Sequence, residues 1–186
     1  MNVEITPYND QKLIELCIAG QEMGYSKLYH KYVKQVYNTV IRLVIDEVEA
    51  EDLTQEIFIS LFDDMNKVKD VQFLGAWLKR VSINKSISYL RKKKIHASEI
   101  EEIQVADESE DEVFEKELKE AQISEIQTAI EELDVEVRTI VNLFLFEDLS
   151  HEEIGKLLGL NSTTVRSKYH RAKLKIFQRI KKVVLS

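Results

Sequence analysis

Apolar residues recur every three or four positions along most of the chain, which is the spacing of one face of an α-helix. This pattern predicts helices over residues 10–19, 25–45, 47–64, 73–93, 112–132, 135–147, 150–158 and 162–182. There is no convincing strand alternation and no internal repeat, and only five glycines and one proline occur. The sequence therefore predicts an all-α fold.

Charge is divided into alternating blocks, although the net charge is -7. Residues 46–64 contain eight acids and no lysine or arginine, whereas residues 71–98 contain seven basic residues and no acid. Residues 99–120 contain eleven acids against two lysines, and residues 155–186 contain nine basic residues and no acid. A protein that is acidic overall can therefore still present local basic surfaces to nucleic acid.

The acidic stretch over residues 95–112 has few large apolar side chains, which is typical of a solvated connection. We predict two small helical domains, residues 1–94 and 113–186, joined by this acidic linker. One interpretation gives the linker no task beyond solubility, and the other makes it a mimic of nucleic acid that screens the neighbouring basic surfaces. Deleting residues 99–111 separates the two, because unchanged DNA affinity would exclude screening.

The segment after residue 149 carries the signals of a helix-turn-helix. Ser150 and Glu153 form a capping-box pattern at the start of a short helix. Gly159 supplies a left-handed residue to end that helix, and Asn161 is a good N-cap for the next one. A helix of about eight residues, a short turn containing glycine and a second, longer helix make up a motif that reads duplex DNA.

The second helix of this motif has two distinct sides. Its predicted buried stripe is Val165, Tyr169, Ala172, Ile176 and Ile180. The candidate DNA-binding residues, able to hydrogen-bond to base edges or phosphates, are Ser162, Thr163, Arg166, Ser167, His170 and Arg171. Lys168, Lys173 and Lys175 flank them and suit phosphates. The simpler alternative is a helical hairpin with a solvated basic face.

The helix over residues 47–64 also has two sides. Its predicted buried stripe is Ala50, Leu53, Ile57 and Leu61. The other side is mainly acidic and consists of Asp52, Gln55, Glu56, Ile59 and Asp63. An isoleucine ringed by acids indicates a protein-docking face, but a solvated acidic face with one stray apolar residue explains the same pattern.

On the helix over residues 73–93, aromatic, amide and guanidinium groups share one stripe. Its members are Phe73, Trp77, Arg80, Asn84, Ser88 and Arg91. Aromatic rings stack on unpaired bases while cations follow the phosphates, which is how proteins hold single strands. The alternative places Phe73 and Trp77 in the core and leaves only the basic end of the helix, residues 91–94, in solvent.

Several protein classes are disfavoured by the sequence. It has no apolar run long enough to span a membrane, and its N-terminus lacks the order of a signal peptide, so we expect a cytoplasmic protein. Cys17 lies among apolar residues, which predicts a buried thiol. The four histidines share no metal-ligand spacing with one another or with Cys17, and no catalytic motif is recognisable. We expect no metal, no cofactor, no small-molecule substrate and no enzymatic activity.

In this order along the chain, the motifs resemble the extracytoplasmic-function (ECF) class of sigma-70 family RNA polymerase sigma factors. Residues 50–58 (AEDLTQEIF) look like the family's polymerase-binding helix, and residues 76–78 (AWL) with Asn84 and Arg91 look like its promoter-melting helix. In the C-terminal half, residues 149–155, 158–160 and 164–172 are similar to the family's second DNA-binding domain.

The resemblance implies a role for each face. Asp52, Gln55, Glu56 and Ile59 would dock on the clamp helices of the largest subunit of core RNA polymerase. Lys79, Arg80, Asn84 and Arg91, with the loop over residues 65–72, would hold the opened non-template strand of the minus-ten element. The helix from Ser162 would read the minus-35 element of promoter DNA. The other partners implied are the polymerase beta flap and an anti-sigma factor.

Two positions depart from the family pattern. Ser88 stands where the family usually has an acid, on the stripe predicted to hold the strand, and Asp134 stands where it usually has a proline. The chief alternative function is a helix-turn-helix regulator whose N-terminal domain senses a ligand or dimerises. A regulatory adaptor that binds only proteins is a third possibility. Promoter-directed transcription with core polymerase separates a sigma factor from both.

Overall fold

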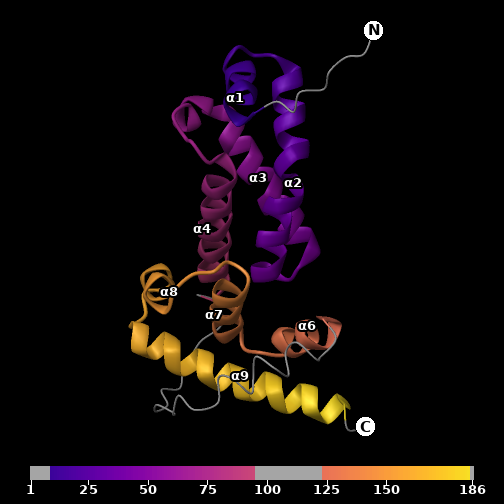
Figure 1. The fold of residues 1–186 in the computed structure, drawn as a ribbon, viewed down its shortest axis with the longest axis vertical. Helices are drawn as coiled ribbons and strands as arrows, with labels where there is room; N and C mark the ends of the chain where they lie inside the picture. Colours follow the sequence, from indigo (N-terminus) through magenta and orange to yellow (C-terminus); the bar gives the residue numbers. More distant parts are fainter. Residues whose placement is uncertain (1–8, 95–122, 185–186) are drawn as a thin grey trace. The chain divides into compact units, whose positions relative to one another are not determined.

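The computed structural model describes residues 9–94 and 123–184, which fall into two helical units, one up to Lys94 and one after it. Every regular element of these residues is a helix (Figure 1). The predicted all-α fold with two helical regions is confirmed. The acidic linker over residues 95–112 and the first part of the helix predicted over residues 112–132 lie outside the described residues.

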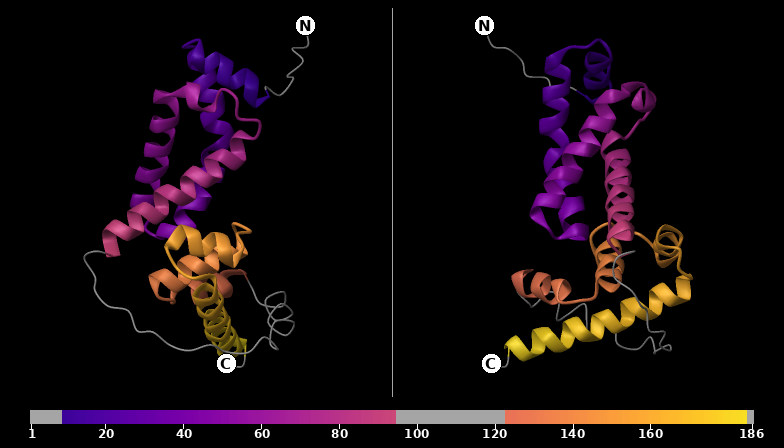
Figure 2. Two further views of the ribbon diagram at one scale, coloured as in Figure 1. Left: turned by 90° about the vertical axis from the view of Figure 1, so that its left-hand side faces the viewer. Right: turned by 180° about the vertical axis from the view of Figure 1, so that it is seen from behind.

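Over residues 9–94, the N-terminal unit contains four α-helices and one short 3-10 helix. These are α1 (Asp10–Ile18), α2 (Glu22–Val44), α3 (Glu47–Asp63), η1 (Met65–Val68) and α4 (Leu74–Lys94). The long α2 packs against α1, α3 and α4, as Figure 2 shows from two sides. Buried leucine, isoleucine and valine side chains from all four helices form one core, because each helix turns its apolar stripe inward.

Helix α2 begins three residues before the predicted start, and its first turn includes Gly24. A Cβ atom on Gly24 would lie 2.7 Å from the Cβ atom of Leu16, so the glycine lets α1 approach α2 closely. Nearby, the hydroxyl of Tyr32 and the ammonium of Lys31 each lie 2.6 Å from the carboxylate of Asp10. Burial and this hydrogen bond raise the pKa of Tyr32. These contacts join α1 to α2.

Aromatic and polar contacts hold α3 and α4 against α2. Tyr29 meets Phe58 edge to face with ring centroids 4.8 Å apart, which fixes α3. The side-chain amide of Gln35 donates to the carbonyl oxygen of Gly75 at 2.9 Å, which fixes the first turn of α4.

The thiol of Cys17, on α1, is buried as the sequence predicts, since Cys17 is 1% exposed. Burial raises the pKa of this thiol.

In the C-terminal unit, the described residues form α6 (Ile123–Glu131), α7 (Val135–Leu145), α8 (His151–Leu158) and α9 (Ser162–Val184). Helix α9 contacts each of the other three (Figure 1). Asp134 is the N-cap of α7, so the position where the family usually has proline does begin a helix. The guanidinium of Arg138 donates to the carbonyl oxygens of Glu131 and Leu133, at 2.9 and 3.3 Å, which satisfies the end of α6.

Candidate nucleic-acid and protein-binding faces

The predicted caps of the helix-turn-helix are all present. The backbone N–H of Glu153 donates to the Ser150 hydroxyl at 3.3 Å, and the Glu153 carboxylate accepts from the Ser150 backbone at 2.9 Å. Gly159 ends α8 in the left-handed region, with φ at 72°. The side chain of Asn161 accepts from the backbone N–H of Thr163 at 2.9 Å. Each of these backbone donors is satisfied by the residue type that the sequence pattern requires.

The turn between α8 and α9 depends on Gly155. A Cβ atom at this position would lie 2.7 Å from the carbonyl oxygen of Leu160. The backbone N–H of Leu160 donates to the Gly155 carbonyl at 2.9 Å, so the two segments are in direct backbone contact. A larger side chain at residue 155 would push α8 away from the start of α9. Gly155 thus fixes the angle at which α9 is presented.

The side of α9 that faces the other helices is the side that the sequence predicts to be buried. Val165, Tyr169, Ala172, Ile176 and Ile180 are all buried, at 9% exposure or less. Helix α9 packs on α6, α7 and α8 through this side, which holds it along its length. The predicted core stripe is confirmed, and the outer side of the helix is left for a ligand.

The candidate residues on α9 differ in their exposure. Thr163 and Arg166 are exposed, whereas Ser162, His170 and Arg171 are half-buried. The hydroxyl oxygen of Ser167 is buried and has no hydrogen-bond partner among the described residues, so it offers no open group to DNA in this conformation. The exposed part of the predicted reading face therefore lies in the first two turns of α9.

The three lysines that flank this face differ in exposure and in contacts, although the sequence predicts the same phosphate-binding role for each. The prediction that Lys173 contacts phosphate is wrong for the present conformation, because Lys173 is 7% exposed and its ammonium lies 5.7 Å from the centre of the Tyr169 ring. Lys168 lies 2.6 Å from the carboxylate of Glu136 on α7. Only Lys175 of the three is exposed. Long side chains fold along apolar neighbours and find distant acids, which periodicity does not predict.

Three aromatic rings join α7, α8 and the start of α9. The His151 imidazole stacks on Phe144, with ring centroids 4.7 Å apart and planes 12° apart. Tyr169 completes the cluster at 4.4 Å from Phe144 and 5.5 Å from His151. The pKa of His151 is lowered by burial and by the nearby charge of Arg166. The sequence did not predict this aromatic cluster, because the spacing of the four histidines is informative only about metal binding.

The outer face of α3 is acidic with exposed apolar residues. Asp52, Gln55 and Glu56 are exposed, and Ile59 is 57% exposed. The predicted buried stripe on the other side of α3 is confirmed, since each of its members is at most 7% exposed. Helical geometry places Val48, which is 70% exposed, on the same line as Ile59. Val48 was not predicted as part of this face, although its eleven-residue separation from Ile59, three helical turns, was a usable signal.

The stripe predicted along α4 is exposed at both of its ends, Phe73 and Arg91. Arg80, Asn84 and Arg91 are exposed, as their shared side of the helix predicts. Phe73 precedes α4 and is 74% exposed, so the interpretation that placed it in the core is wrong. Trp77 is half-buried and packs against the core. Phe73 lies outside the core because Leu74, not Phe73, fills the buried position at the start of the helix.

Two candidate residues differ from the rest of their faces: Lys79 is partly buried, and Glu56 is exposed but ion-paired. Lys79 is half-buried, and its position one residue before Arg80 turns it about 100° from the stripe. Glu56 lies 3.0 Å from the ammonium of Lys85 on α4. The acidic face of α3 and helix α4 are therefore connected by an ion pair between Glu56 and Lys85.

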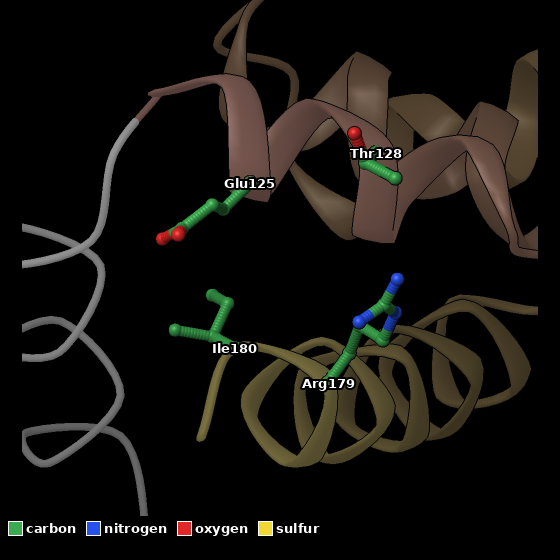
Figure 3. Close-up of a pocket in the computed structure, with 4 residues that line it drawn as sticks. All are labelled: Glu125, Thr128, Arg179 and Ile180. Carbon is green, nitrogen blue, oxygen red and sulfur yellow. The ribbon is translucent and has the colours of Figure 1, made fainter. Parts of the chain in front are cut away.

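A small pocket lies between α6 and α9, at the opposite end of α9 from the reading face (Figure 3). It is lined by Glu125, Thr128, Arg179 and Ile180, and Arg179 pairs with Glu132 at 3.0 Å beside it. Its volume of about 180 Å³ is below that of ordinary ligand pockets.

In the part of the chain that the structure describes, no group of acids, histidines or cysteine could hold a metal ion. No helix there is long and apolar enough to cross a membrane.

Comparison with known proteins decides the family. Residues 28–95 match the family model for Sigma-70 region 2, and residues 123–176 match the model for Sigma-70, region 4. The RNA polymerase sigma-E factor of Streptomyces avermitilis is 30% identical over 148 residues, which are 77% of this chain and 80% of that protein. The chain is an ECF-type sigma factor of the sigma-70 family.

Other sigma factors support this assignment. The ECF RNA polymerase sigma factor SigE of Mycolicibacterium smegmatis is 32% identical over 152 residues, 81% of this chain and 59% of that longer relative. The ECF RNA polymerase sigma factor SigW of Bacillus subtilis is 28% identical and covers 88% of this chain and 92% of its own length. The sigma factor therefore acts in transcription initiation, and membership in this non-enzymatic family implies core RNA polymerase and promoter DNA as partners.

Solved structures share the fold. The sigma factor RpoE of Bartonella quintana, solved with the anti-sigma factor NepR, has a TM-score of 0.53 at 18% identity and covers 84% of this chain and 96% of its own. CnrH, solved with the cytosolic domain of CnrY, has a TM-score of 0.51 at 18% identity and covers 93% of this chain and 97% of its own. The alternative of a helix-turn-helix regulator whose N-terminal domain senses a ligand or dimerises is not supported, because residues 28–95 match Sigma-70 region 2.

Proposed function

We propose that this sigma factor directs core RNA polymerase to two-part promoters through three separate faces. The acidic face of α3 docks on the polymerase clamp, the exposed stripe of α4 holds the opened minus-ten strand, and the outer side of α9 reads the minus-35 duplex. The observation that carries the proposal is the exposed stripe of α4. An aromatic ring that is 74% exposed beside exposed arginines and an asparagine is poorly explained by the stability of the unit alone.

The docking face of α3 combines charge with apolar anchors. Asp52 and Gln55 lie between the exposed side chains of Val48 and Ile59. Apolar side chains surrounded by polar ones are the usual arrangement of a protein interface, because burial of the apolar centre supplies affinity and the polar rim selects the partner. The occupant proposed is the clamp of the largest polymerase subunit, by likeness to the family's polymerase-binding helix.

The two DNA-binding faces suit different forms of DNA. On α4, Phe73 can stack on an unpaired base while Arg80 and Arg91 follow the phosphates, with Asn84 between them. On α9, Arg166 and Thr163 are exposed at the start of a helix that three other helices hold in place, which suits the base edges of a duplex major groove. The beta flap of polymerase and an anti-sigma factor are further partners of this proposal. A solved sigma factor of the same fold bound to an anti-sigma factor supports the latter.

Promoter-directed transcription with purified core polymerase tests the proposal. We expect the sigma factor to bind core polymerase, to give initiation at defined start sites and to bind duplex promoter DNA weakly when alone. A strong promoter footprint by the free protein, unchanged by added core polymerase, would contradict it.

Substitutions on α3 test the division of labour. Asp52→Asn combined with Gln55→Ala should weaken core binding, because two polar groups of the docking face lose their partners. Glu47→Gln, a change at an exposed acid in the first turn of α3 and on another side of the helix, is the matched control and should leave core binding near the wild-type value. Equal loss in both variants would contradict a specific docking face.

A further inference from the structure

The aromatic cluster of Phe144, His151 and Tyr169 has no part in the three faces described above. It lies where α7, the first residue of α8 and the second turn of α9 meet. Tyr169 follows Arg166 by three residues, so the cluster supports the turn of α9 that carries the exposed arginine. We propose that His151 is a positioning residue for minus-35 recognition, which holds the reading face of α9 in place only while its imidazole is neutral. This inference rests on the minus-35 role proposed for α9.

The geometry favours a neutral ring. The Nε2 atom of His151 is buried and has no hydrogen-bond partner among the described residues. A neutral imidazole can leave that nitrogen as a bare acceptor, but an imidazolium carries a hydrogen on both nitrogens. Protonation would therefore bury a charged donor with no acceptor, which is costly unless the ring leaves the stack.

The charged groups around the ring act in the same direction. From α9 the ring meets Arg166, whose positive charge disfavours an imidazolium, and the phenol of Tyr169. From α7 it meets Phe144, which does not titrate. On α8 itself Glu152 is exposed, and Glu153 is turned back to the Ser150 cap at 2.9 Å. The ring also occupies the first residue of α8, where the positive end of the helix dipole disfavours a cation.

The sign of the pH effect follows from these contacts. The pKa of His151 is lowered from its ordinary value of 6.5, first by burial and then by Arg166. The stack is therefore complete above about pH 6.5 and is lost as the pH falls through the lowered pKa. A single site with a pKa no higher than 6.5 can reduce minus-35 binding at pH 5.5 by no more than about tenfold.

The test uses holoenzyme made with the full chain and a promoter from which it initiates. Affinity is measured for the intact promoter and for the same DNA with a scrambled minus-35 element, at pH 7.5 and at pH 5.5. The ratio of the two affinities removes the pH dependence of polymerase itself. In the wild type, we expect this ratio to fall between pH 7.5 and pH 5.5, by up to about tenfold.

Variants distinguish positioning from general stability. His151→Phe keeps a ring in the stack and cannot be protonated, so its ratio should stay constant with pH. His151→Ala should lower the ratio at both values of pH. His30→Gln is the matched control, because His30 is an exposed histidine of α2 and lies outside the C-terminal unit; this variant should keep the fall.

Two results would overturn the inference. One is the same pH-dependent fall in His151→Phe as in the wild type, and the other is a wild-type ratio in His151→Ala at pH 7.5. A wild-type ratio of one at pH 7.5 would instead contradict the minus-35 role itself, so failure of the proposed function is recognised separately.

Discussion

Helices α4 and α9 both present basic residues, but they are held in different ways. Helix α9 is buried along its inner side by α6, α7 and α8, and short caps and Gly155 fix its start. Helix α4 rests on α2 and α3, and its exposed stripe begins with an aromatic ring outside the core. A rigid helix suits the fixed geometry of a duplex groove, whereas an exposed ring can meet an unpaired base in several positions. Substitutions on each helix can break or sharpen this contrast.

The largest effect is expected at Gly155. Gly155→Val would bring a branched side chain against the carbonyl oxygen of Leu160, which a Cβ atom alone approaches to 2.7 Å. We expect a loss of about 3 kcal/mol in the stability of the C-terminal unit, the upper part of the usual range for overpacking. Thermal unfolding and minus-35 binding measure it. Gly159→Ala is the control, since φ is 72° there with no atom within 4 Å, and should cost only about 1 kcal/mol.

Phe73→Ala should weaken binding to an opened minus-ten strand by about 1–3 kcal/mol, because one stacking surface is lost. The melting temperature of the protein should not change, since Phe73 is 74% exposed. Holoenzyme binding to fork DNA with an unpaired minus-ten strand measures the effect. An equal loss on DNA that remains double-stranded would remove the distinction drawn between α4 and α9.

Arg166→Ala should cost about 1–3 kcal/mol at the preferred minus-35 sequence and relax the sequence preference, because a base-edge contact is lost. Lys175→Ala, at an exposed lysine of the same helix, should weaken all sequences alike and reduce the salt slope by about one. Salt titrations on preferred and scrambled duplexes compare the two variants. If both behaved as Lys175→Ala, α9 would position DNA without reading it.

The smallest effect concerns the ion pair of Glu56 and Lys85. A double-mutant cycle with Glu56→Gln and Lys85→Gln should give a coupling of about 0.2–1 kcal/mol in unfolding, as for other exposed pairs. Core binding should fall only in the variants that change Glu56, if that carboxylate exchanges Lys85 for polymerase. Loss of core binding in Lys85→Gln alone would show that the ion pair itself orients the docking face.

The sequence alone determined what depends on neighbours along the chain. Helical periodicity predicted the buried stripes of α3 and α9, and residue types predicted the Ser150 capping box and the left-handed Gly159. Four- and seven-residue neighbours share a helix face, and caps act within one turn, so these features are local. The order of the sequence motifs along the chain was enough by itself to show the resemblance to the sigma family.

Only the tertiary structure decided which of those groups are available. Lys168 and Lys173 have the spacing of phosphate contacts, but one meets Glu136 and the other lies over Tyr169. Phe73 looks like a core residue, but Leu74 fills that position. His151 gains its partners from α7 and α9, through ring contacts that its own helix does not supply. Long and aromatic side chains choose among contacts from other helices, and that choice depends on the packing of the whole unit.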